Sequence, residues 1–91
     1  MTSNLDSVLE SLRSSYAASL PEKIENLRKL WEGQNAMELQ KAAHKLKGSG
    51  ESYGFPEISH ICARLESAAE LSDWISIAQM LSDLEDITKT L

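Results

Sequence analysis

Apolar residues recur every three or four positions along almost the whole chain, which is the spacing of an amphipathic α-helix. The first stripe consists of Leu5, Val8, Leu9, Leu12 and Tyr16. A second stripe follows, with Ile24, Leu27, Leu30 and Trp31. We expect both stripes to face the core, because burial of one apolar face is what stabilises such helices in a folded protein.

The junction between these two stripes carries the signals of a helix start. Ser19 can cap a helix, Glu22 can complete a capping box, and Pro21 is tolerated in a first turn. The junction therefore predicts either a kink or the start of a new helix. Ser3 and Asp6 can form a similar capping box at the start of the first helix.

Glycine, proline and capping residues mark the next helix ends. Gly33 is expected to end the second helix in a left-handed conformation. Asn35, with Glu38 three residues later, predicts a capping box at the start of the third helix. Gly54 followed by Pro56 predicts the end of that helix and the start of the fourth.

The C-terminal half adds two stripes with the same spacing, separated by a short break at 71–73 that includes a capping residue. They consist of Ile58, Ile61, Cys62, Leu65 and Ala69, and then of Trp74, Ile77, Ala78, Leu81 and Leu84. No segment alternates as a strand does, and no hairpin dipeptide occurs. The whole pattern predicts an all-α fold, an antiparallel up-down four-helix bundle with an additional N-terminal helix.

Length and composition fit one helical domain over residues 1–91. The net charge of −5 argues against a general nucleic-acid binder, because phosphate backbones need clustered Lys and Arg. The lone Cys62 permits no internal disulfide. No apolar run is long enough to span a bilayer, and the N-terminus lacks the pattern of a signal peptide. We expect a cytoplasmic monomer.

His44 stands out in the third helix because it lies opposite the apolar stripe. On a helical wheel of about 100° per residue, the core-facing residues lie about 160° to 260° away from it. These residues are Leu39, Ala42, Ala43, Leu46 and Tyr53. The outer face carries His44 with Met37, Gln40, Lys41, Lys47, Gly48 and Glu51. We therefore expect an exposed histidine that the core does not need.

Gly48 lies one turn from His44 on this outer face. A glycine inside an exposed helix costs about 1 kcal/mol relative to alanine, and nothing in the local sequence offsets that cost. We interpret Gly48 as clearance for something that approaches His44. Gly50 points towards the core, where we expect it to allow close packing of helices.

An exposed neutral imidazole is a competent nucleophile at cytosolic pH. Lys47 can balance the charge of a phosphoryl group on His44, and Lys41 and Lys45 flank the site less directly. The chain has no glycine-rich phosphate loop and no Ser/His/Asp arrangement. Phosphate must therefore come from one protein and pass to another.

The segment around His44 resembles the histidine-containing phosphotransfer (HPt) family of multistep phosphorelays. The family pattern of His, a variable residue, Leu, Lys, Gly, Ser and a later apolar residue with Gly is matched in order. The matching residues are His44, Leu46, Lys47, Gly48, Ser49, Tyr53 and Gly54, followed downstream by Ile58, Ile61, Cys62, Leu65 and Glu66. The resemblance covers essentially the whole chain.

The resemblance implies that His44 accepts a phosphoryl group from a receiver-domain aspartate and donates it to another, without independent turnover. Lys47 would stabilise phosphoryl charge, Gly48 would let the receiver approach, and Ser49 and Gly54 would be structural. The receiver would supply Mg²⁺, so the chain needs no cofactor of its own. A hybrid sensor histidine kinase is a second implied partner. The docking face would comprise Met37, Gln40, Lys41, Lys45, Gly48 and Glu51.

Glu51 departs from the family, which usually has a small or neutral residue at this position. The acidic side chain puts the choice of partner in question, but not the chemistry.

Two other classes of function compete with phosphotransfer. One is a non-catalytic helical adaptor that docks receiver domains, although an adaptor does not need the nucleophile His44. The other is a metal site of His44, His60 and Cys62, but His60 and Cys62 face different sides of their helix. An independent enzyme would need a second catalytic group, and none is evident.

Overall fold

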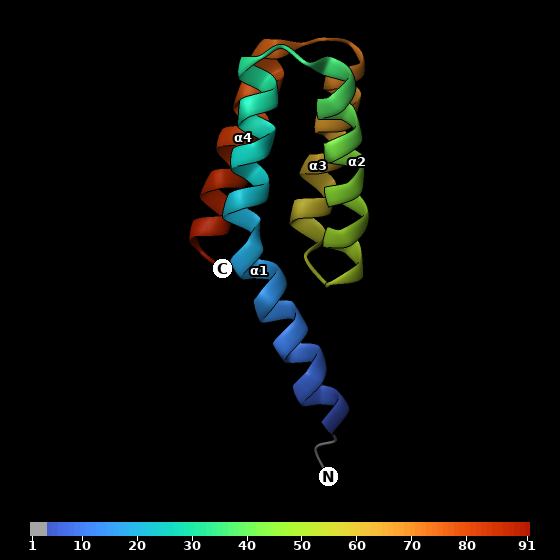
Figure 1. The fold of residues 1–91 in the computed structure, drawn as a ribbon, viewed down its shortest axis with the longest axis vertical. Helices are drawn as coiled ribbons and strands as arrows, with labels where there is room; N and C mark the ends of the chain where they lie inside the picture. Colours follow the sequence, from blue (N-terminus) through green and yellow to red (C-terminus); the bar gives the residue numbers. More distant parts are fainter. Residues whose placement is uncertain (1–3) are drawn as a thin grey trace.

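The computed structural model describes residues 4–91 and contains four α-helices. The helices are α1 (Asn4–Glu32), α2 (Ala36–Ser52), α3 (Pro56–Glu70) and α4 (Trp74–Lys89). They run alternately up and down, and each packs against two neighbours, so that α1 lies between α4 and α2 (Figure 1). No strand occurs within residues 4–91. The predicted all-α fold and up-down bundle are confirmed.

The additional N-terminal helix expected from the sequence is not a separate element. One continuous helix, α1, forms the N-terminal third of the chain and has Pro21 inside it. Pro21 lacks an N–H donor, but Leu20 and Ile24 on either side of it are buried and hold the helix against the core. Ser19 therefore does not cap a helix. Its hydroxyl donates a hydrogen bond to the Tyr16 carbonyl at 2.6 Å.

Replacing Pro21 with alanine is expected to stabilise the protein. Alanine restores an N–H donor in the helix interior and removes the clash between the proline ring and the preceding turn, which together cost up to about 3 kcal/mol. We expect the midpoint of urea unfolding to rise. If a new helix began near Ser19 instead, Pro21 would occupy a favourable first-turn position, and the midpoint would stay the same or fall.

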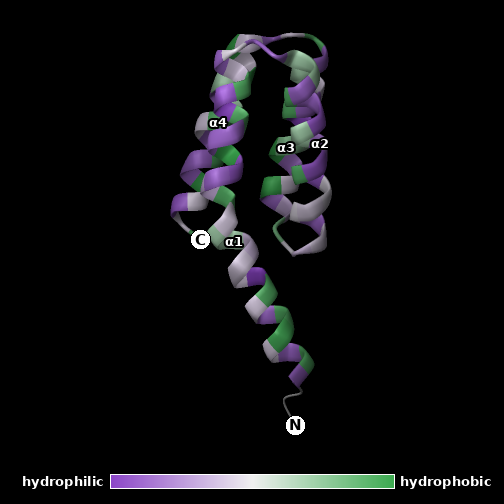
Figure 2. Cartoon of the chain, in the orientation of Figure 1, coloured by the Kyte–Doolittle hydropathy of each residue, from purple (hydrophilic) through white to green (hydrophobic). Residues whose placement is uncertain are grey.

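The expectation that the first apolar stripe faces the core is wrong for four of its five residues. Leu5, Val8, Leu9 and Leu12 are between 46% and 63% exposed, and only Tyr16 is buried. The cause is length, because α1 has 29 residues whereas α2, α3 and α4 have 17, 15 and 16. Figure 2 shows hydrophobic positions on the part of α1 that extends beyond the other helices.

The remaining predicted stripes form the core. Its buried side chains are Tyr16, Leu20, Ile24 and Leu27 of α1, Leu39, Ala43 and Leu46 of α2, Ile58, Cys62, Leu65, Ala68 and Ala69 of α3, and Ile77, Leu81 and Leu84 of α4. Leu30, Trp31, Ile61 and Trp74 are partly buried at its edges. No charged side chain is buried in the described part of the chain. The apolar side chains of α2 therefore suffice to pack this helix into the bundle, and its polar outer face makes no contribution to the core.

Most of the predicted helix ends are confirmed. The Asn35 side chain caps α2 and the Asp73 side chain caps α4, each accepting a hydrogen bond from the backbone N–H three residues later. Gly54 has a φ of +81° after the end of α2, and Pro56 is the first residue of α3. The capping box proposed for Ser3 lies outside the described residues.

The end of α1 differs from the prediction by one residue. Gln34, not Gly33, has a positive φ of 52°. The Gly33 N–H still donates to the Lys29 carbonyl at 3.0 Å, so helical hydrogen bonding continues through the glycine. The left-handed residue therefore comes one position later than the sequence suggested.

Candidate functional site

His44 lies in the middle of α2 with its side chain 68% exposed. Leu39, Ala43 and Leu46 on the opposite face of the helix are buried in the core. The outward position of His44 agrees with the helical wheel. His44 faces solvent because the opposite side of α2 is buried in the core.

Glu66 of α3 contacts His44 directly. Its Oε2 lies 2.8 Å from His44 Nδ1, and its Oε1 lies 3.2 Å from the same nitrogen. The Glu66 side chain is only 23% exposed, whereas His44 is largely open to solvent. The more buried carboxylate thus contacts one edge of the ring and leaves the other edge accessible.

This contact determines which ring nitrogen is free. A carboxylate only accepts hydrogen bonds, so His44 Nδ1 must carry the proton that Glu66 accepts. In the neutral ring the lone pair then resides on Nε2. No hydrogen bond to Nε2 is found within residues 4–91. The arrangement presents Nε2 as a nucleophile directed away from α3.

Gly48 and Gly50 differ sharply in their surroundings. A Cβ atom at Gly48 would meet nothing within 4 Å, so the surface beside His44 is open. A Cβ atom at Gly50 would lie 3.2 Å from the Ser59 backbone nitrogen and 3.3 Å from Ile58 Cγ2. Gly50 therefore allows the close packing of α2 on α3, as expected, whereas no contact within the fold requires a glycine at position 48.

The two glycines make a matched pair for mutation. Gly48→Gln should fold with at least the parent's stability, because glutamine is favoured over glycine in an exposed helix by about 0.5–1 kcal/mol. Gly50→Gln should lose on the order of 1–3 kcal/mol or more, because its side chain would force α2 away from α3. Urea unfolding of both variants tests this difference. A loss of stability in Gly48→Gln comparable to that in Gly50→Gln would show that position 48 is not open.

A shallow hollow of about 300 Å³ adjoins His44. It is lined by Gln40, Lys41, His44, Lys45 and Glu66. Lys41 forms an exposed ion pair with Glu38 at 3.7 Å. Lys41 and Lys45, which the sequence predicts only to flank the site, therefore share a surface with His44.

The remaining predicted site residues do not line this hollow. Lys47 is partly buried, and its carbonyl accepts a hydrogen bond from the Ser59 hydroxyl of α3 at 2.8 Å. Met37, Gly48 and Glu51 are exposed on α2 outside the hollow. The outer face of α2 is therefore a strip along the helix, and only part of it is concave.

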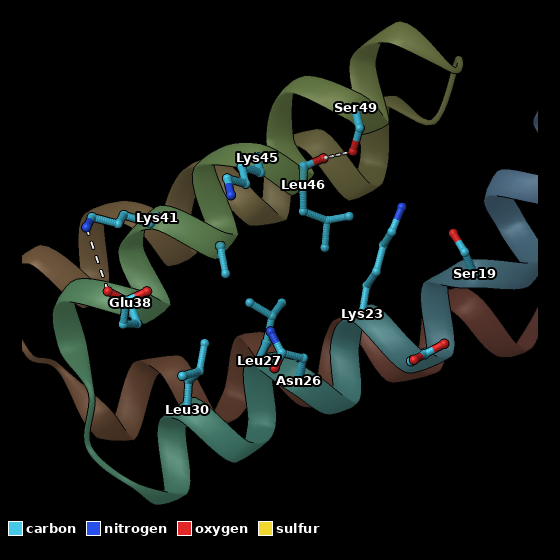
Figure 3. Close-up of a pocket in the computed structure, with 12 residues that line it drawn as sticks. Ser19, Lys23, Asn26, Leu27, Leu30, Glu38, Lys41, Lys45, Leu46 and Ser49 are labelled. Atoms are coloured by element: carbon cyan, nitrogen blue, oxygen red, sulfur yellow. Dashed lines mark hydrogen bonds and ion pairs between the residues drawn. The ribbon is translucent and has the colours of Figure 1, made fainter.

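A larger groove of about 890 Å³ lies between α1 and α2 (Figure 3). Leu27 and Leu30 of α1 and Leu46 of α2 point towards one another across it. The groove is also lined by Ser19, Glu22, Lys23, Asn26, Glu38, Lys41, Ala42, Lys45 and Ser49. Because Lys41 and Lys45 line both concavities, the surface beside His44 continues towards α1.

Ser49 joins α2 to α1. Its hydroxyl lies 2.8 Å from the Tyr16 hydroxyl, and it donates to the Leu46 carbonyl at 3.2 Å. The Tyr16 ring stacks on Tyr53 with 4.6 Å between centroids, next to Gly54. These contacts are consistent with structural roles for Ser49 and Gly54.

The alternative metal site would require His44, His60 and Cys62 to converge. Cys62 is fully buried, and burial raises the pKa of its thiol to about 12, which keeps it protonated. His60 is exposed on α3. Among the residues that the structure describes, no group of three His, Cys, Asp or Glu side chains could hold a metal ion.

Nothing in the local pattern of residues around His44 predicts its contact with Glu66. The two residues are 22 positions apart, and their contact depends on how α3 packs against α2. The only signal in the sequence is the Leu65-Glu66 pair of the family pattern, and the pattern alone assigns no role to the carboxylate.

A family model described as the Hpt domain matches residues 11–90, which is nearly the whole chain. The chain belongs to the Hpt domain family. Hpt domains are phosphocarrier modules of two-component signalling that interact with receiver domains and kinases, and they are not catalysts in their own right.

Searches of curated proteins and of solved structures found no significant match. No helix within residues 4–91 is long and apolar enough to cross a membrane.

Proposed function

We propose that His44 is the phosphoryl carrier of a multistep phosphorelay, accepting a phosphoryl group from one receiver aspartate and donating it to another. The contact between Glu66 and His44 Nδ1 carries this proposal, because it leaves the Nε2 lone pair open. The open surface at Gly48 supports it, since a domain-sized partner must reach His44.

The transfer step needs no proton movement on His44. The Nε2 lone pair attacks phosphorus, the N–P bond forms, and the P–O bond to the aspartate breaks as its carboxylate leaves. Nδ1 keeps its proton, so the phosphorylated ring is formally cationic. The Glu66 carboxylate, 2.8 Å away, balances that charge. In the reverse step an aspartate attacks, the N–P bond breaks, and the neutral imidazole is restored.

The lysines of α2 would balance the charge on the transferring group. Lys47 is the residue that the family pattern assigns to this task. Lys41 and Lys45 line the hollow beside His44 and add positive potential on the side facing α1. A receiver would supply Mg²⁺ and the remaining catalytic groups, so this chain only has to present a positioned nucleophile.

The receiver would dock on the outer face of α2. The docking residues are Met37, Gln40, Lys41, Lys45, Gly48 and Glu51. Met37 is 67% exposed and offers an apolar contact at one end of this face. Glu51 is exposed at the other end, where it would repel an acidic receiver surface or pair with a basic one. Glu51 would therefore select among receivers without changing the chemistry at His44.

The proposed setting is the cytoplasm, with a hybrid sensor histidine kinase as the upstream source of phosphate. Incubation with a radiolabelled phospho-receiver tests the proposal. We expect acid-labile, base-stable label on this chain, together with loss of label from the receiver. An adaptor would bind the receiver and remain unlabelled, which would contradict phosphotransfer.

A further inference from the structure

The exposed segment of α1 before the bundle, residues 4–12, is here termed the α1 extension. Its apolar residues are Leu5, Val8, Leu9 and Leu12, each at least 46% exposed. They fall within an arc of about 100° on a helical wheel, so they form one continuous stripe. Contiguous exposed aliphatic side chains of this kind mark an interaction surface.

The stripe carries no charge. Asp6 and Glu10 point more than about 100° away from its centre. Arg13, the first residue after the extension, donates to the Tyr53 and Gly54 carbonyls at 3.0 and 3.4 Å and is therefore held against the bundle. A second apolar helix could cover the stripe without burying an unpaired charge, which is the usual obstacle to such packing.

We infer that the α1 extension pairs with the same segment of a second copy of this chain, in antiparallel orientation. The stripe is self-complementary, because Leu5 of each copy then faces Leu12 of the other, and Val8 faces Leu9. A two-fold axis through the middle of the stripe relates the copies, as in most homodimers. The extension protrudes from the end of the molecule, so the two bundles lie at opposite ends of the pair and do not collide (Figure 1).

The size of the stripe limits the strength of this dimer. Four half-exposed side chains are a small surface compared with the roughly 800 Å² that each partner buries in a standard interface. The dimer is therefore weak and depends on concentration.

His44 lies about 12 Å along α2 from the end nearest the extension, so pairing leaves it accessible. The inference does not depend on the proposed function, and it departs from the monomer expected from the sequence.

Sedimentation velocity of the full chain over a wide concentration range tests the inference. The parent protein should show a reversible monomer–dimer equilibrium. Leu9→Glu should raise the dissociation constant at least tenfold, whereas Ser7→Glu, which adds the same charge on the opposite side of the helix, should leave it unchanged. His44→Gln should dimerise like the parent whatever the outcome of phosphotransfer. A parent that stays monomeric at every concentration, or a Leu9→Glu variant that dimerises normally, would overturn the inference.

Disulfide trapping tests the orientation. When Leu5→Cys and Leu12→Cys variants are mixed and oxidised, crosslinks between the two variants should exceed those within either one. Preferred pairing of Leu5→Cys with itself would contradict the antiparallel arrangement.

Receiver binding by the same variants tests the alternative occupant of the stripe. A monomeric parent whose receiver binding is lost in Leu9→Glu and kept in Ser7→Glu would identify the receiver as the occupant and overturn the homodimer.

Discussion

The variant His44→Gln is expected to carry no label after incubation with a phospho-receiver. Glutamine preserves much of the bulk of histidine but has no nucleophilic nitrogen, so no N–P bond can form. The variant should keep its fold, because the His44 side chain is 68% exposed and surface changes of this kind are usually within about 0.5 kcal/mol. Urea unfolding and circular dichroism check that the loss is chemical and not structural.

The chain contains its own control for this experiment. His60 is its second histidine and is exposed on α3. The same substitution there, His60→Gln, should leave labelling at the parent level. Equal labelling of His44→Gln and the parent, or loss of label only in His60→Gln, would exclude His44 as the acceptor.

Glu66→Gln is expected to slow transfer by about tenfold to a hundredfold without abolishing it. A glutamine amide can donate to Nδ1 as readily as it accepts, so the ring can adopt the tautomer whose lone pair is on Nδ1 instead of Nε2. The variant also lacks the carboxylate that balances the phosphorylated ring. Outer-shell partners of histidine ligands in metal sites have effects of this size when they are mutated.

Glu70→Gln is the matched control for Glu66→Gln. Glu70 lies one turn further along α3, is exposed, and loses the same charge on substitution. We expect it to transfer at the parent rate. The ¹⁵N shifts of the His44 ring provide a second measurement, in which the parent should be protonated at Nδ1 and Glu66→Gln should shift towards the other tautomer. Unchanged ring shifts together with an unchanged rate would show that Glu66 does not position His44.

The bundle and the outward position of His44 could be predicted because both follow from local periodicity. A stripe such as Leu39, Ala43 and Leu46 fixes which face of α2 is buried, and the opposite face then follows from helix geometry. Helix geometry also separates Gly48 from Gly50, since two positions along a helix change the face by about 200°.

Two features could not be predicted from periodicity. An amphipathic stripe shows that a helix has an apolar face, but not whether a neighbour is long enough to cover it. The pattern therefore wrongly places Leu5, Val8, Leu9 and Leu12 in the core. Pro21 and Ser19 resembled a helix start, yet buried residues on either side of them keep α1 continuous. The prediction missed tertiary packing in both cases.

The most direct test is to locate the phosphate on the protein after transfer from a phospho-receiver. Long-range ¹H–¹⁵N correlation spectra of the labelled chain, read with the ³¹P signal, distinguish phosphorylation at Nε2 from phosphorylation at Nδ1. We expect one phosphoryl group, on Nε2 of His44, with Nδ1 still protonated towards Glu66. Phosphate on Nδ1, on another residue, or on neither histidine would contradict a site in which Glu66 presents Nε2 to the receiver.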